Sequence, residues 1–88
     1  MMKPISDKEK LELQNIIVGG SYRHYKGNLY TVLNVARHSE TLELMVIYRA
    51  EYESDLGNNV IWSRPLSMFL EKLENKPHQN RFELIQKQ

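Results

Sequence analysis

The middle of the chain is rich in side chains that favour β-strands, and two short polar or glycine-containing segments interrupt it. The pattern predicts strands over Tyr22–Lys26, from Leu29 to about Arg37, and over Leu42–Glu51. Gly27-Asn28 is a two-residue turn signal, so the first two strands are predicted to form a hairpin. The polar run His38–Thr41 predicts a tight loop before the third strand.

Alternation along these strands predicts which side chains share a face, because successive residues of a strand point to opposite sides. In the second strand, one predicted face consists of Tyr30, Val32, Asn34, Ala36 and His38. In the third strand, the predicted inward face consists of Leu42, Leu44, Val46 and Tyr48. Neither face of the first strand is purely apolar, so the pattern leaves open which one is buried.

A short helix is predicted before the strands, from about Asp7 to Ile16. Ser6 has the properties of an N-cap, and Glu9 stands three residues later, as a capping box requires. Apolar residues at helical spacing follow, so the helix is expected to pack on the body of the domain. Gly19-Gly20 ends this segment and leads into the first strand.

The second half of the chain is less regular. Turn residues fill Glu53–Asn59, and Val60–Ser63 is a short β-prone run. Pro65 favours a helical turn over Leu66–Phe69, because proline is tolerated at the first helical position. A strand is expected directly after that turn. The last two segments are Asn75–Asn80, a predicted polar loop, and Arg81–Ile85, a predicted closing strand with Phe82 and Leu84 on one face.

These elements predict a mainly β fold. The expected architecture is a small, strongly bent antiparallel SH3-like barrel of about five to six strands, with an N-terminal helix and one helical turn before the last strands. A chain of 88 residues supplies one domain. We therefore expect an N-terminal extension with a short helix over residues 1–20 and a β-barrel domain over residues 21–86.

Composition restricts the chemistry and the location. The chain has no cysteine, which excludes disulfides, thiolate metal sites and thiol catalysis. The first residues are charged and lack the apolar core of a signal peptide. The longest apolar runs are too short to span a bilayer. We expect a cytoplasmic protein that is not inserted in a membrane.

Charge is unevenly distributed although the net charge is only +1. Gly19–Ser39 contains basic residues and no acid, whereas Glu40–Asn58 contains five acids and one arginine. One interpretation is charge pairing between neighbouring strands. The other is a local anion-binding site on the basic hairpin. A strongly basic footprint, typical of nucleic-acid binders, is missing.

Several motifs occur in the order found in a family of short bacterial proteins that contain a domain of unknown function. They are Tyr22–Gly27 with Tyr30, Ala36–Thr41, Val46 with Tyr48, Trp62–Leu66 with Met68-Phe69, and Arg81-Phe82. The chain resembles this family from about Gly20 to Ile85. The resemblance implies a small β-barrel-like domain, and it supplies no activity, ligand or catalytic residue.

The chain contains two sets of residues with the side-chain types of a catalytic or a metal site. His38, Ser39 and Glu40 contain the side-chain types of a hydrolytic site, but adjacent residues do not converge as a triad must. The alternative interpretation of this segment is a turn whose side chains form hydrogen bonds with the neighbouring backbone. His24, His38, Glu40 and His78 lack the spacing of a known metal motif, so no metal and no cofactor are predicted.

Aromatic residues interleaved with arginine and lysine favour a binding face, since such faces stack bases or rings and hold anions. The predicted ligand-binding residues are Arg23, His24, Tyr25, Lys26, His38, Ser39, Glu40, Tyr48, Trp62 and Arg64. The predicted ligand is a nucleotide, a nucleic acid or another anionic molecule, and we expect a binding module and not an enzyme. A protein-interaction or homo-oligomerisation domain is the first alternative, and a small hydrolase using His38, Ser39 and Glu40 is the second.

Overall fold

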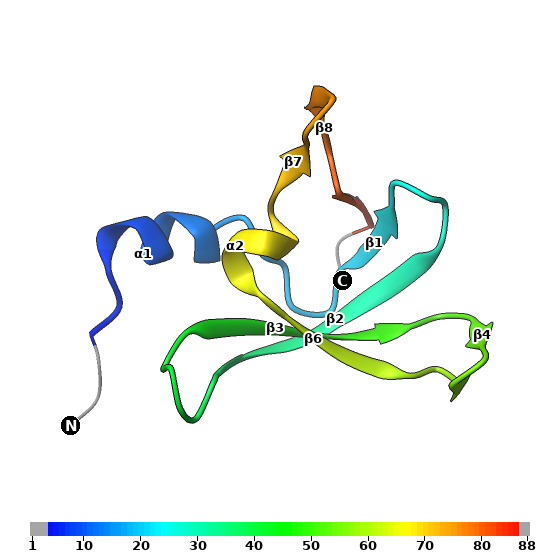
Figure 1. Ribbon diagram of the computed structural model, residues 1–88, viewed down its shortest axis with the longest axis horizontal. Coiled ribbons are helices and arrows are strands. Elements are labelled where there is room, and N and C mark those ends of the chain that lie inside the picture. The colour runs from blue at the N-terminus through cyan, green and yellow to red at the C-terminus, as the bar shows by residue number, and fades with distance from the viewer. Residues whose placement is uncertain (1–3, 87–88) are drawn as a thin grey trace.

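The computed structural model describes residues 4–86, so residues 1–3 of the predicted extension lie outside it. Within this range the chain forms two helices and nine short strands (Figure 1). In chain order these are α1 (Asp7–Leu13), β1 (Ser21–His24), β2 (Leu29–Arg37), β3 (Leu44–Ala50), β4 (Glu53–Ser54), β5 (Gly57–Asn58), β6 (Ile61–Pro65), α2 (Leu66–Phe69), β7 (Lys72–Leu73), β8 (Lys76–Asn80) and β9 (Phe82–Gln86).

Five strands form one sheet in the order β6-β3-β2-β1-β9, and each neighbouring pair is antiparallel. Two small ribbons, β4-β5 and β7-β8, extend from it. The predicted fold class is confirmed: a mainly β antiparallel domain with an N-terminal helix and a helical turn before the last strands. Among the described strands β6 and β9 are the two edges of the sheet, so its closure into a barrel stays a prediction.

The sheet is bent around a core of aromatic and aliphatic side chains. The buried core residues are Ile16, Tyr22, Tyr30, Val32, Leu44, Val46, Tyr48, Ala50, Leu66, Phe69 and Phe82. Phe82 of β9 stacks on Phe69 of α2 with ring centroids 4.2 Å apart, and it lies 5.5 Å from Tyr48 of β3. Because β9, at one end of the strand order, meets β3 and the helical turn that follows β6, the packing of this cluster holds the bend.

The N-terminal helix forms as its capping residues predict. The Ser6 hydroxyl accepts from the Glu9 amide, and the Glu9 carboxylate accepts from the Ser6 amide. The helix ends at Leu13 instead of near Ile16. Ile16 is nevertheless buried in the core, so the non-helical segment after α1 attaches the helix to the sheet.

Several predictions of local structure were wrong. Leu42, predicted to face inward from the third strand, lies in the β2-β3 turn with a φ of 65°, and β3 begins at Leu44. The β1-β2 connection is a four-residue turn, residues 25–28, in which Gly27 has a φ of 108°. In β2 the pairing register shifts between Val32 and Asn34. After this shift Val35 packs against the core, whereas Asn34 and Ala36, predicted to share the face of Tyr30 and Val32, are exposed. The predicted polar loop Asn75–Asn80 largely forms β8, which pairs with β7.

Candidate functional site

A hollow of about 190 Å³ opens where residues from five strands and the start of the β4-β5 ribbon come together; we call it the aromatic pocket. Its lining consists of His24, Tyr30, Tyr48, Tyr52, Trp62, Arg64 and Phe82. Tyr30, Tyr48 and Phe82 are buried core residues and form its floor. The Trp62 side chain is 38% exposed and stands at the rim. The pocket is therefore a hollow in the surface of the aromatic core.

Strand pairing explains why these residues meet. Tyr48 of β3 lies opposite Trp62 of β6, and His24 of β1 lies opposite Phe82 of β9. Tyr30 of β2 contacts the Tyr48 ring at a centroid distance of 5.3 Å. The bend of the sheet then places the Arg64 guanidinium of one edge strand 5.6 Å from the Phe82 ring centre on the other edge strand.

The hydroxyl groups around the pocket are linked to one another and to the cation. The Tyr30 and Tyr52 hydroxyls share a hydrogen bond of 2.7 Å, and Arg64 Nε donates to the Tyr48 hydroxyl at 3.4 Å. Burial, followed by the hydrogen bond to Tyr52, raises the pKa of Tyr30 well above its usual range. The Tyr30 hydroxyl thus stays protonated, and the pocket offers neutral hydroxyls together with one guanidinium.

His24 supplies a second nitrogen donor to the pocket. Its Nδ1 accepts a hydrogen bond of 3.2 Å from the Lys26 amide, so the proton of the neutral ring lies on Nε2. Burial lowers the pKa of His24, and the positive charges of Arg64, Arg81 and Lys26 lower it further. His24 is therefore a neutral hydrogen-bond donor in a positively charged environment.

The electrostatics of the pocket favour an anion. Its lining contains no carboxylate, and Arg64 forms no ion pair with any residue between 4 and 86. Other arginines of the chain do pair: Arg49 with Glu51 at 2.9 Å and Arg81 with Glu71 at 3.3 Å. Aromatic cages also recognise quaternary ammonium groups, but a guanidinium inside the cage would repel such a ligand.

A second, smaller hollow of about 80 Å³ adjoins the aromatic pocket, because His24 lines both. Its other lining residues are Arg23, Tyr25, Gln79, Asn80 and Glu83. Lys26 Nζ lies 5.8 Å from the centre of the Tyr25 ring. The structure thus brings seven of the ten predicted site residues to one region: Arg23, His24, Tyr25, Lys26, Tyr48, Trp62 and Arg64.

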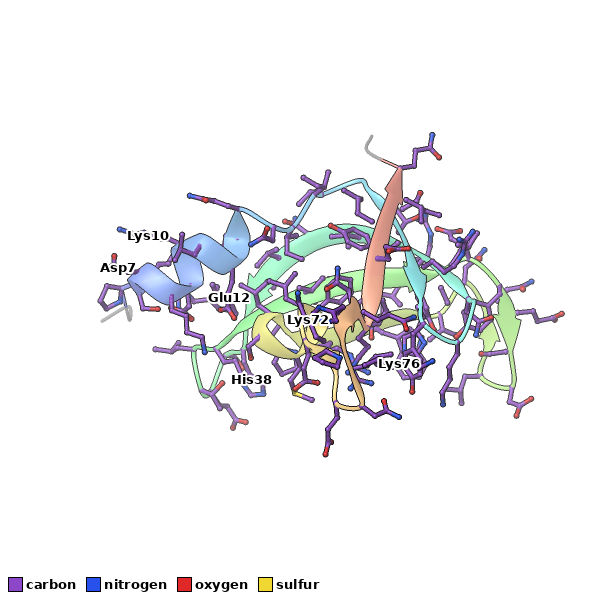
Figure 2. The ribbon with its side chains drawn as sticks, turned by 90° about the horizontal axis from the view of Figure 1, so that it is seen from above. Asp7, Lys10, Glu12, His38, Lys72 and Lys76 are labelled. Carbon is purple, nitrogen blue, oxygen red and sulfur yellow. The ribbon has the colours of Figure 1, made fainter. Side chains whose placement is uncertain are left out.

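The other three predicted residues, His38, Ser39 and Glu40, lie elsewhere. They follow β2 at the end opposite the turn that contains Lys26, and the nine residues of that strand span roughly 30 Å. Figure 1 shows the β2-β3 turn on the side of the molecule where α1 lies, and Figure 2 labels His38 on the same side. They therefore do not belong to the region around the aromatic pocket.

These residues have a structural role in the β2-β3 turn. His38 Nδ1 accepts from the amides of Glu40 and Thr41, and the Thr41 hydroxyl accepts from the Glu43 amide. Ser39 forms no hydrogen bond with His38 in the part of the chain that the structure describes. Turn geometry thus explains the composition of this segment, and no triad is assembled there.

Three residues that line the aromatic pocket were not among the predicted site residues. Tyr30 and Phe82 occur in the sequence motifs quoted above, but their alternation assigns them to the core, and they serve as both core and pocket floor. Tyr52 stands next to a turn-rich segment and carries no signal in the sequence. The contact between Tyr52 and Tyr30 depends on the bend of the sheet, which the sequence pattern does not predict.

No group of three potential metal-ligating side chains gathers within residues 4–86. His78 is exposed on β8, and Figure 1 shows β8 on a different side of the molecule from the β2-β3 turn that contains His38. None of the helices in the described range is long and apolar enough to cross a membrane.

Comparison with known proteins identifies the family. A family model described as "Protein of unknown function (DUF1653)" matches residues 20–84. The chain belongs to the DUF1653 family. The match begins just before β1 and ends within β9, so it includes every residue of the aromatic pocket and leaves α1 outside.

A solved structure supports the same assignment for this DUF1653 chain. It is the crystal structure of a DUF1653 protein from Bordetella bronchiseptica, with 32% sequence identity and a TM-score of 0.71. The alignment covers 85% of this chain and 94% of the other. Among curated proteins, none is similar in sequence. The predicted resemblance to a family of unknown function is thus confirmed.

The environment of His24 predicts how the stability of the DUF1653 domain depends on pH. Because the pKa of His24 is lower in the folded chain, the unfolded chain binds the proton more tightly. The contribution of His24 to the free energy of unfolding is therefore fully present above about pH 6.5, the ordinary pKa of histidine. This contribution is lost as the pH falls through the lower pKa that His24 has in the folded chain. Urea unfolding at about pH 7.5 and at several pH values between about 6.5 and 4.5 measures this loss of stability.

His24→Gln is expected to reduce the loss of stability on acidification, whereas His78→Gln, on exposed β8, is the matched control and keeps the wild-type loss. Identical acid dependence in the wild type and His24→Gln contradicts this description of His24.

Proposed function

We propose that this DUF1653 protein is a non-enzymatic binding module for a nucleotide or a single-stranded nucleic acid. One observation carries the proposal: an aromatic hollow without carboxylates contains an arginine that has no carboxylate partner in the described chain. Aromatic faces stack with bases, and arginine supplies the contact to phosphate. The pocket thus offers a stacking surface for the base of a nucleotide and a hydrogen-bonding cation for its phosphate.

The size of the pocket supports a limited contact. Its volume of about 190 Å³ lies below the range of about 300–1,000 Å³ typical of pockets that enclose a whole small molecule. We infer that one base or one comparable planar group enters the pocket. The remainder of the ligand then lies over the adjoining surface around Arg23, Tyr25 and Lys26.

The low net charge of the chain supports weak binding to a few nucleotides and argues against binding to a long duplex. The net charge is +1, so long-range attraction to a polyanion is small. Local cations around His24 still provide contacts for one or two phosphates. The proposed affinity is therefore modest and sensitive to salt.

Trp62 provides a direct assay, because it is the single tryptophan of the chain and it lines the pocket. Its fluorescence is measured at low salt during titration with a short thymidine oligonucleotide, with AMP and with inorganic phosphate. We expect saturable quenching by the oligonucleotide and by AMP, since a stacked base quenches indole, and little change with phosphate alone. Absence of saturable quenching by any nucleotide contradicts the proposed function.

A second candidate is a protein-interaction or homo-oligomeric domain. It is favoured by the two outer edges of the sheet, since β6 and β9 each pair with one neighbouring strand among the described strands. Ile61 on β6 and Ile85 on β9 are also exposed. Light scattering over a concentration series tests it, and a constant monomer mass contradicts self-association.

A further inference from the structure

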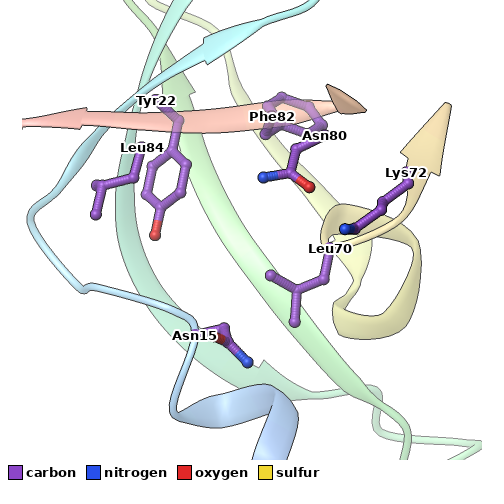
Figure 3. Close-up of a pocket in the computed structure, with 7 residues that line it drawn as sticks. All are labelled: Asn15, Tyr22, Leu70, Lys72, Asn80, Phe82 and Leu84. Atoms are coloured by element: carbon purple, nitrogen blue, oxygen red, sulfur yellow. The ribbon is translucent and has the colours of Figure 1, made fainter. Parts of the chain in front are cut away.

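A larger hollow, about 460 Å³ in volume, lies between the segment after α1, the β7-β8 ribbon and the sheet (Figure 3). We call it the ribbon hollow. Its lining consists of Asn15, Tyr22, Leu70, Lys72, Asn80, Phe82 and Leu84. Its volume is within the range of pockets that bind small molecules. It differs from the aromatic pocket in every lining residue except Phe82.

The polar groups around the ribbon hollow are mostly hydrogen-bond donors. Figure 3 shows Lys72 and Asn80 extending from the ribbon side, with Asn15 on the opposite side. Within the described residues, the side chains of Lys72 and Asn80 form no hydrogen bond or ion pair. Asn15 uses one amide hydrogen on the Leu11 carbonyl and keeps the other. Three donor groups are thus available at the rim.

The floor of the ribbon hollow is apolar and ends in one further donor. Tyr22 and Phe82 are buried there, and Leu70 and Leu84 are half-buried. The Tyr22 hydroxyl accepts from the Ile17 amide at 3.0 Å, which leaves its own O–H able to donate. No carboxylate lines the hollow. A ligand with an apolar body and an accepting, negatively charged head matches this distribution.

We propose that the ribbon hollow is a second binding site, for a small carboxylate with an apolar chain or ring. The apolar part lies on Phe82, Leu70 and Leu84, and the carboxylate accepts hydrogen bonds from Lys72 and the asparagine amides. One ammonium group matches a head with a single charge, whereas a phosphate dianion generally recruits several cations. This site does not depend on nucleotide binding in the aromatic pocket.

The test compares three probes of similar length: hexanoate, hexanol and hexylamine. Each is titrated into ¹⁵N-labelled full-length protein. The side-chain amide signal of Asn15, which lines the ribbon hollow and neither of the other two hollows, reports locally, and the signal of Asn80, which also lines the smaller hollow beside the aromatic pocket, is followed with it. We expect saturable shifts with hexanoate at a Kd on the order of 1 mM, at least fivefold weaker binding of hexanol, and none of hexylamine. The indole signal of Trp62, which lines the aromatic pocket only, is expected to remain in place.

Lys72→Gln is expected to weaken hexanoate binding about tenfold, because it removes the charge beside the carboxylate. Lys76→Gln is the matched control, since Lys76 is exposed on the same ribbon and does not line the hollow (Figure 2). Both substitutions are at exposed positions, so the fold is retained. Absence of saturable shifts with hexanoate overturns the proposal, as do equal affinities for the three probes or equal losses in the two variants.

Discussion

Phe82→Ala is expected to lower the free energy of unfolding by about 3–5 kcal/mol, the cost of truncating a buried phenylalanine. The Phe82 ring is 5% exposed, and it contacts the rings of His24, Tyr30, Tyr48 and Phe69. Its removal leaves a void where β9 meets the rest of the sheet. For a domain of this size, the thermal midpoint is expected to fall by roughly 15–30 °C.

Ile85→Ala is the matched control for this change, because Ile85 is on the same strand but 41% exposed. Its free energy of unfolding is expected to stay within about 0.5 kcal/mol of the wild type. Urea and thermal unfolding followed by circular dichroism measure both variants. If Phe82→Ala is no less stable than Ile85→Ala, the aromatic cluster does not hold the bend as described.

The second large effect concerns binding. Arg64→Gln is expected to weaken binding of the thymidine oligonucleotide at least tenfold at low salt, because it removes the charged group of the aromatic pocket. The slope of log affinity against log salt concentration is also expected to flatten by roughly 0.7, the value for one phosphate contact on a single strand. Trp62 fluorescence at several salt concentrations measures both quantities.

Arg49→Gln is the control for Arg64→Gln, since it removes the same charge from the neighbouring strand. Arg49 pairs with Glu51 and does not line the aromatic pocket. Its affinity and salt dependence are expected to stay within about twofold of the wild type. Equal losses in the two variants would show that binding follows total charge and does not use the pocket.

Local sequence signals predicted much of the fold. Ser6 and Glu9 define the start of α1, Pro65 defines the start of α2, and the alternation of β3 correctly assigns Val46 and Tyr48 to the core. In each case the deciding interaction lies within a few residues along the chain or follows from the two-residue repeat of a strand.

The errors occurred where the backbone departs from a regular repeat. A bulge near Leu33 reverses the faces of β2, and a bulge requires one extra residue that side-chain composition does not reveal. The Gly27-Asn28 signal indicated the right place for a turn but not its length, which depends on the pairing of Arg23 with Leu29. Polar residues such as Gln79 gave no sign that a paired ribbon would form.

The candidate site was predicted in part, for a related reason. Charge and aromatic content pointed to His24, Trp62 and Arg64, which the fold brings together. The same criterion also selected His38, because composition does not tell how far apart two ends of a strand lie. Tyr52 was missed, since its contact with Tyr30 requires the bend of the whole sheet.

Intermolecular NOEs between the protein and a bound thymidine oligonucleotide test the central claim most directly. If a base enters the aromatic pocket, its protons are expected to give NOEs to the Trp62 indole and to the rings of Tyr48 and Tyr52. These NOEs are expected to disappear in Arg64→Gln at the same ligand concentration. NOEs confined to other surfaces, such as the β7-β8 ribbon or the turn at His38, would contradict the account.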